Sequence, residues 1–120
     1  MLFGALFLMS AMQADETLTR VGENVFVQTK TIGKQFRGYK GYTPVRITIR
    51  QDKVVRVDAL PNQETPQYFE MAKTLLKNFE GKTVKQAAKM KVDAVSGATY
   101  SSEALIGNVK AGLEYYQKNK

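Results

Sequence analysis

The stretch Thr43-Pro-Val-Arg-Ile-Thr-Ile-Arg50 alternates apolar and polar side chains along its length. The apolar members are Val45, Ile47 and Ile49, and the polar members are Arg46, Thr48 and Arg50. Successive side chains of a strand point to opposite faces, so the pattern predicts a β-strand with one buried and one solvated face.

The flanking segments extend this strand into a small sheet. Residues 51–53 (Gln-Asp-Lys) predict a turn, and Val54-Val-Arg-Val-Asp-Ala59 predicts the second strand of a hairpin. Upstream, the β-branched segment Asn24–Thr29 predicts a further strand. Residues 38–42, which contain two glycines and two tyrosines, predict a tight loop before the hairpin.

From Pro61 the apolar period changes to that of a helix. Thr65 is expected as an N-cap and Pro66 as the first helical residue. An apolar stripe with spacings of three and four residues then predicts one amphipathic helix; it comprises Phe69, Ala72, Leu76 and Phe79. Gly81 is expected to end that helix.

Two more helices are predicted downstream. Thr83-Val-Lys-Gln86 has the form of a capping box that opens a short helix. After a loop over residues 93–99, a second stripe predicts a C-terminal helix; its members are Ile106, Val109, Leu113 and Tyr116. Strands followed by helices predict an α+β fold, a small and mainly antiparallel sheet packed with helices.

The composition excludes several classes of chemistry. The 120 residues fit one domain, and they include no Cys and no His. Thiol nucleophiles, Ser-His-Asp catalysis and thiolate or imidazole metal sites are therefore excluded, and any chemistry has to come from a bound cofactor. We expect no catalytic residue and no metal site. The net charge of +7 is spread along the chain, which favours a solvated basic surface over a nucleic-acid site.

The first 14 residues carry no charge and contrast with the polar sequence that follows. They are too short for a membrane-spanning helix, which needs about 20 apolar residues. Their composition and their end at Ala14 are typical of a secretory signal peptide, so residues 15–120 are expected to form the single mature domain. The alternative is a buried or amphipathic N-terminal helix. The first interpretation predicts an exported protein, periplasmic or on the outer face of the cytoplasmic membrane.

The segment Asp93-Ala-Val-Ser-Gly-Ala-Thr-Tyr-Ser-Ser102 places four hydroxyl side chains around a Gly-Ala pair at the start of a predicted helix. Gly97 permits unusual backbone angles, Ala98 leaves space, and the free N–H groups of a first helical turn attract anions. The pattern therefore predicts a cradle for a phosphate. A serine-rich loop that ends in an ordinary N-cap is the alternative.

Ser96-Gly97-Ala98-Thr99 resembles the S-G-A-T flavinylation motif of the FMN-binding domain family, which includes the C subunit of sodium-pumping NADH:quinone reductase and the G subunit of the Rnf complex. Gly41-Tyr-Thr-Pro-Val45 is similar to the family's glycine-containing lead into its first core hairpin. Gln63-Glu-Thr-Pro66 resembles its E-T-P-G loop, with Gln67 in the place of the glycine. The three features occur in the family's order and cover residues 38–116.

The resemblance implies an FMN cofactor and a fold like that of the FMN-binding domain. Thr99 would be the acceptor, joined to the FMN phosphate as a phosphoester by a separate, Mg²⁺-dependent flavin transferase that uses FAD. The resemblance and the cradle together give a set of candidate cofactor-binding residues besides Thr99: Gly41, Tyr42, Glu64, Thr65, Pro66, Asp93, Ser96, Gly97, Ala98, Tyr100, Ser101 and Ser102. Tyr39 and Tyr42 could pack an aromatic ring on the isoalloxazine or simply pack in the protein.

Two functions of different class remain at this point. The first is an exported flavoprotein that carries electrons between redox partners, with membrane-bound proteins among the candidates. The sequence has no G-x-G-x-x-G dinucleotide fingerprint, so we expect a relay rather than oxidation of NADH by this chain alone. The alternative is a non-catalytic module that binds FMN noncovalently, another phosphorylated ligand or a protein partner.

Overall fold

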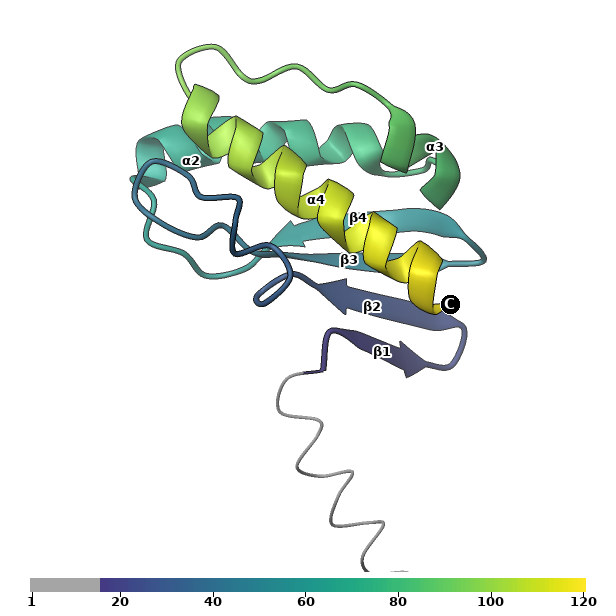
Figure 1. The fold of residues 1–120 in the computed structure, drawn as a ribbon. Helices are drawn as coiled ribbons and strands as arrows, with labels where there is room; N and C mark the ends of the chain where they lie inside the picture. The colour runs from purple at the N-terminus through teal and green to yellow at the C-terminus, as the bar shows by residue number, and fades with distance from the viewer. Residues whose placement is uncertain (1–15) are drawn as a thin grey trace, which may run out of the picture.

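The computed structural model describes residues 16–120, which form a four-stranded antiparallel sheet with helices on one face (Figure 1). The strands follow one another in chain order: β1 (Leu18–Val21), β2 (Asn24–Gln28), β3 (Val45–Arg50) and β4 (Lys53–Ala59). The helical elements are α2 (Pro66–Lys73), the 3₁₀ helix η2 (Thr74–Phe79), α3 (Val84–Lys89) and α4 (Thr99–Asn119). The predicted α+β class is confirmed.

The β3–β4 hairpin forms where the alternation predicts it. Val45, Ile47 and Ile49 are fully buried beneath the helices. The turn is made by Gln51 and Asp52, which both have positive φ, of 53° and 61°. Two successive residues with positive φ are typical of the tight hairpin turn whose twist matches that of the strands.

The solvated face of the hairpin differs from the prediction at Thr48, which is only 7% exposed. Thr48 pairs with Phe26 on β2 and with Arg56 on β4. Because both neighbours have much longer side chains, we infer that they shield the small threonine side chain from solvent. The expectation that Thr48 is solvated was therefore wrong, although its side chain does lie opposite the core.

The predicted helix from Thr65 to Phe79 is in fact two elements. Thr65 is the N-cap, Pro66 is the first helical residue, and the four stripe residues are buried as expected. The α-helix nevertheless ends at Lys73, and Thr74 begins η2 with its hydroxyl donating to the Met71 carbonyl at 2.8 Å. Such a side-chain bond competes with the helical backbone pattern and favours a change of helix type.

Strand β1 is absent from the sequence prediction. It pairs antiparallel with β2, from Leu18 opposite Val27 to Val21 opposite Asn24. Three of its four residues are exposed, so the segment lacks the alternation that marks the other strands.

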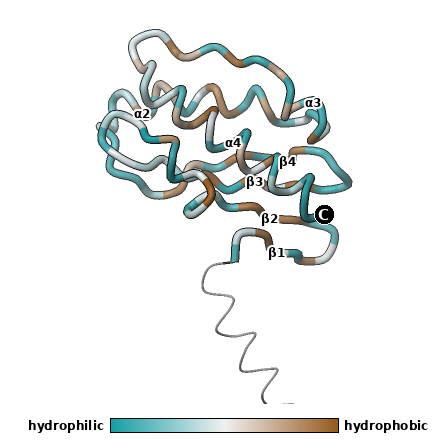
Figure 2. The backbone as a smooth tube through the Cα atoms, viewed as in Figure 1, coloured by the Kyte–Doolittle hydropathy of each residue, from teal (hydrophilic) through white to brown (hydrophobic). Residues whose placement is uncertain are grey.

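The core lies between the sheet and the helical layer of α2, η2, α3 and α4, and Figure 2 shows hydrophobic residues on both layers. Gly112 allows the helix to approach closely, because a Cβ there would lie 2.6 Å from Ile47 Cδ1. None of the helices within residues 16–120 combines the length and the apolar character that crossing a membrane requires. The predicted signal peptide, residues 1–14, lies outside the described residues.

Candidate functional site

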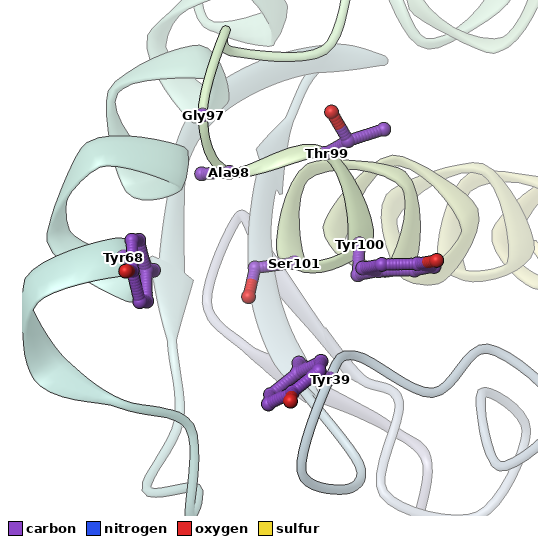
Figure 3. Close-up of a pocket in the computed structure, with 7 residues that line it drawn as sticks. All are labelled: Tyr39, Tyr68, Gly97, Ala98, Thr99, Tyr100 and Ser101. Carbon is purple, nitrogen blue, oxygen red and sulfur yellow. The ribbon is translucent and has the colours of Figure 1, made fainter.

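A hollow of about 310 Å³ lies at the start of α4, between that helix, α2 and the loop that precedes β3 (Figure 3). Its lining consists of Tyr39, Tyr68, Gly97, Ala98, Thr99, Tyr100 and Ser101. None of these side chains is charged, and three of them are aromatic. The volume is at the lower end of the range of ligand pockets, which suits a flat ligand that stays partly exposed.

The three tyrosines come from three separate segments and surround Ser101 in Figure 3. Their exposed fractions are 71% for Tyr39, 47% for Tyr68 and 67% for Tyr100. The ring centroids of Tyr39 and Tyr100 are 6.1 Å apart, with an interplanar angle of 38°. Exposed aromatic rings gathered around a hollow provide apolar area for a planar aromatic ligand.

The first turn of α4 offers backbone donors. Ala98 is the N-cap residue, and no side chain among residues 16–120 caps this end. The Ala98 carbonyl accepts the first helical bond, from the N–H of Ser102 at 2.9 Å. The N–H groups of residues 99–101 therefore precede the helical ladder, and with the helix dipole they favour an anion.

Gly97 gives the loop its sharp entry into α4. Its φ is +87°, a conformation that residues with a side chain rarely adopt. Among residues 16–120, a Cβ at this position would meet only Met71 Cε, at 3.4 Å, so the backbone angle is the dominant constraint. Ala98 follows the glycine, and the next residue is exposed Thr99, whose side chain extends from the helix start on the side opposite Tyr39 in Figure 3.

Glu64 lies behind the hollow and is buried. Its Oε1 accepts hydrogen bonds from the Tyr39 N–H at 2.8 Å and from the Ser101 hydroxyl at 2.6 Å. Its Oε2 accepts from the N–H groups of Lys40 at 2.6 Å and Gly41 at 3.0 Å. Successive backbone N–H groups that converge on one carboxylate form an anion-binding concavity, here filled by the protein's own side chain.

The environment of Glu64 favours its ionised form. Burial alone would raise the pKa of this carboxyl group. The hydrogen bonds from Ser101 and from the N–H groups of residues 39–41 outweigh that effect and lower the pKa below its ordinary value. Glu64 is therefore an anion that is fully satisfied inside the protein.

The structure brings five of the predicted residues into the hollow: Gly97, Ala98, Thr99, Tyr100 and Ser101. Glu64 and Gly41 support it from behind through the hydrogen bonds described above. Ser102 is fully buried, and its oxygen accepts from the Val95 N–H at 2.9 Å. The Ser101 and Ser102 hydroxyls thus have partners within the protein.

The remaining predicted residues lie around this site without lining it. Asp93 and Ser96 are exposed in the loop that leads to α4. Thr65 is the N-cap residue of α2 but makes no side-chain cap bond within residues 16–120, and Pro66 lines a separate hollow of about 390 Å³ that Glu64 also lines. Tyr42 packs against Arg37, with the guanidinium carbon 5.2 Å from the ring centroid.

Two residues of the site were missed by the sequence analysis, Tyr68 and Met71, both on α2. Tyr68 lines the hollow, and the Met71 methyl group lies close to Gly97. Both fall outside the apolar stripe of that helix and are exposed. Large apolar side chains on the solvated side of an amphipathic helix were the signal that could have identified them.

A family model described as the FMN-binding domain matches residues 38–114, nearly two thirds of the chain. No curated protein matches the sequence. The matched range contains all the residues that line the hollow. The chemistry of the lining fits the group that the family binds, because the tyrosine rings suit an isoalloxazine and the free N–H groups of α4 suit a phosphate.

Proposed function

Because the chain belongs to the FMN-binding domain family and FMN is its cofactor, we propose that it is an exported flavoprotein that carries FMN covalently on Thr99 and passes electrons between redox partners. The observation that supports this most directly is the position of Thr99, an exposed hydroxyl at the uncapped start of α4, on the rim of a tyrosine-lined hollow. FMN, when bound, supplies one- and two-electron chemistry.

Attachment would be a phosphoryl transfer from FAD by a flavin transferase with Mg²⁺. The Thr99 oxygen forms a bond to the phosphorus on the riboflavin side of FAD, the pyrophosphate bond breaks, AMP leaves, and the hydroxyl proton is released. This step needs an accessible hydroxyl with small neighbours, and Gly97 and Ala98 immediately precede Thr99. It requires neither His nor Cys from this chain, and the sequence contains neither.

In the loaded protein, the residues of the site would have separate tasks. The free N–H groups at the start of α4 would stabilise the remaining phosphate charge. The rings of Tyr39, Tyr68 and Tyr100 would contact the flavin and exclude part of the water around it. The surplus of basic side chains would favour docking of acidic redox partners or anionic membrane surfaces, with association rates that fall as salt rises.

The test is the mass of the denatured protein after co-expression with a flavin transferase. Wild type should gain the mass of one FMN less water, and Thr99→Ala should gain none because it lacks the oxygen that forms the ester. Thr99→Ser keeps a hydroxyl at the same position and should retain the adduct. An adduct of equal yield on Thr99→Ala contradicts the assignment of Thr99.

Noncovalent binding of FMN is the second candidate, and the tyrosine-lined hollow supports it independently of Thr99. In that case flavin would accompany the native protein through purification. Denaturation would then release all of it, and neither wild type nor Thr99→Ala would carry added mass beyond its own polypeptide chain. The same experiment therefore separates the two functions.

A further inference from the structure

The turn before β3, residues 38–41, is closed by its own backbone hydrogen bonds. Arg37 and Tyr42 form an isolated antiparallel bridge, and the Gly38 N–H donates to the Gly41 carbonyl at 2.7 Å. This leaves the N–H groups of Tyr39, Lys40 and Gly41 inside the turn, where the Glu64 carboxylate accepts all three. The exposed ring of Tyr39 therefore stands on a backbone whose shape depends on a residue more than twenty positions away.

The same carboxylate also reaches the first turn of α4. Glu64 Oε1 accepts from the Tyr39 N–H and the Ser101 hydroxyl together, and Tyr39 and Ser101 both line the hollow. One oxygen atom thus joins two sides of the hollow that lie about sixty residues apart in the sequence. The fit is close, because a Cβ on Gly38 would lie 2.4 Å from this oxygen.

We propose that Glu64 is a positioning residue for the flavin: it fixes the 38–41 turn against the start of α4 and so holds the Tyr39 ring at the edge of the hollow. The carboxylate does not face the ligand itself, since its hydrogen bonds are made to the turn and to Ser101. This inference rests on the binding of FMN in the hollow and does not depend on the ester at Thr99.

The substitution Glu64→Gln tests the geometry with little change of volume. Each oxygen of the carboxylate accepts two hydrogen bonds, and at least one of the two comes from a backbone N–H group. The amide nitrogen of Gln only donates, so at either position it would leave at least one backbone N–H group without an acceptor. We expect the dissociation constant of free FMN, measured by flavin fluorescence without a transferase, to rise about tenfold. Hydrogen exchange of the amides of residues 39–41 should accelerate in the absence of FMN.

Tyr116→Phe is the matched control. It removes one hydrogen bond, from the Tyr116 hydroxyl to Asp52 Oδ1 at 2.6 Å, near the opposite end of α4. This substitution lowers stability without changing the 38–41 turn. The dissociation constant of the Tyr116→Phe variant for FMN should therefore stay within about twofold of wild type. Equal losses in the two variants would show that Glu64 acts only through global stability and would overturn the proposal.

A double-mutant cycle asks whether Glu64 acts through Tyr39. Tyr39→Ala should weaken FMN binding, and adding Glu64→Gln should weaken it little further, because the ring that the turn positions is already gone. Additive losses would contradict this coupling. If Glu64→Gln does not fold, Gly38→Ala takes its place, since the new methyl group displaces the carboxylate while leaving its charge in the chain.

The readouts distinguish this proposal from that on Thr99. A Glu64→Gln variant that binds free FMN as tightly as wild type overturns the positioning role, whatever the mass of the transferase-treated protein. A wild-type protein that does not bind free FMN also overturns the positioning role of Glu64. The adduct on Thr99 is measured separately, by the mass of the denatured protein.

Discussion

The backbone angle at Gly97 sets the direction in which the chain enters α4. With φ at +87°, a β-branched residue here has to distort the loop, at a cost of about 1–3 kcal/mol. We expect Gly97→Val to lower the yield of flavin adduct severalfold in the co-expression assay. Lys91→Ala, at an exposed position earlier in the same loop, should leave the yield unchanged, and equal yields for the two variants would show that the compact turn is not needed.

The ionisation of Glu64 makes a further prediction, on the stability of the protein in acid. Its hydrogen bonds lower its pKa in the folded state below the ordinary 4.5 of an unfolded chain. The stabilisation is therefore fully present above pH 4.5, and it is lost as pH falls through the lowered pKa of the folded state. The difference in unfolding free energy between wild type and Glu64→Gln should be largest near neutral pH and shrink in acid.

Urea titrations at a series of pH values measure this difference directly. Ser101→Ala removes one of the four bonds to the carboxylate and should show a smaller gap from wild type. A gap between wild type and Glu64→Gln that stays constant into the acid range would contradict the stabilised anion.

Site residues could be predicted from the sequence where they belong to one short motif, and not where the fold brings them together from distant segments. Gly97 and Thr99 belong to one short motif, so the sequence alone predicted both, and Gly97 adopts the unusual angle expected of it. Tyr68 could not be selected in the same way, because its role depends on how α2 lies beside α4. The hydrogen bonds of Glu64 connect its own loop with the 38–41 turn and with Ser101. No spacing within the sequence predicts that these three segments lie together.

At the scale of elements, the end of α3 is held by α4. The Lys110 ammonium group donates to the carbonyls of Ala87 and Ala88, at 3.2 and 3.0 Å, and to that of Met90. These carbonyls lie at or just beyond the C-terminal turn of α3, where the helix leaves them without internal partners and where a cation also suits the helix dipole.

Lys110→Met should therefore lower the free energy of unfolding by about 1–2 kcal/mol, because it keeps the aliphatic length but loses the donors. Lys85→Met, on an exposed position of α3, is the control and should stay within about 0.5 kcal/mol of wild type. Chemical denaturation measures both. Equal effects would mean that the bonds to the carbonyls contribute nothing to stability.

The elements themselves were predictable where periodicity was strong. Strand β3 and helix α4 each have a regular buried face, and both lie where the pattern predicted them. Strand β1 could not be predicted, since pairing with β2 rather than burial of a face defines it. The change to η2 depends on local hydrogen bonds such as that of Thr74, which leave the apolar stripe intact.

At the scale of the whole molecule, the proposal of export has a direct test. Cleavage after Ala14 would give a mature chain that begins at Asp15. N-terminal sequencing of protein from the periplasmic or extracellular fraction of the native cell should find that terminus. Ala14→Tyr should block the cleavage, because the site requires a small residue, and an intact Met1 on cytoplasmic wild-type protein would contradict export.

Helix α4 also sets a fixed distance between the candidate site and the other end of the helix. Its 21 residues, at about 1.5 Å each, place the site at Thr99 roughly 30 Å from the C-terminal end, and Figure 1 shows the two ends of the helix far apart. Because these 120 residues include no cysteine, the substitution Lys120→Cys would introduce a single thiol among them as an attachment point. A dye there would report energy transfer to the flavin over a known separation, and a chain tethered by that thiol to an electrode would present its flavin end to the solution.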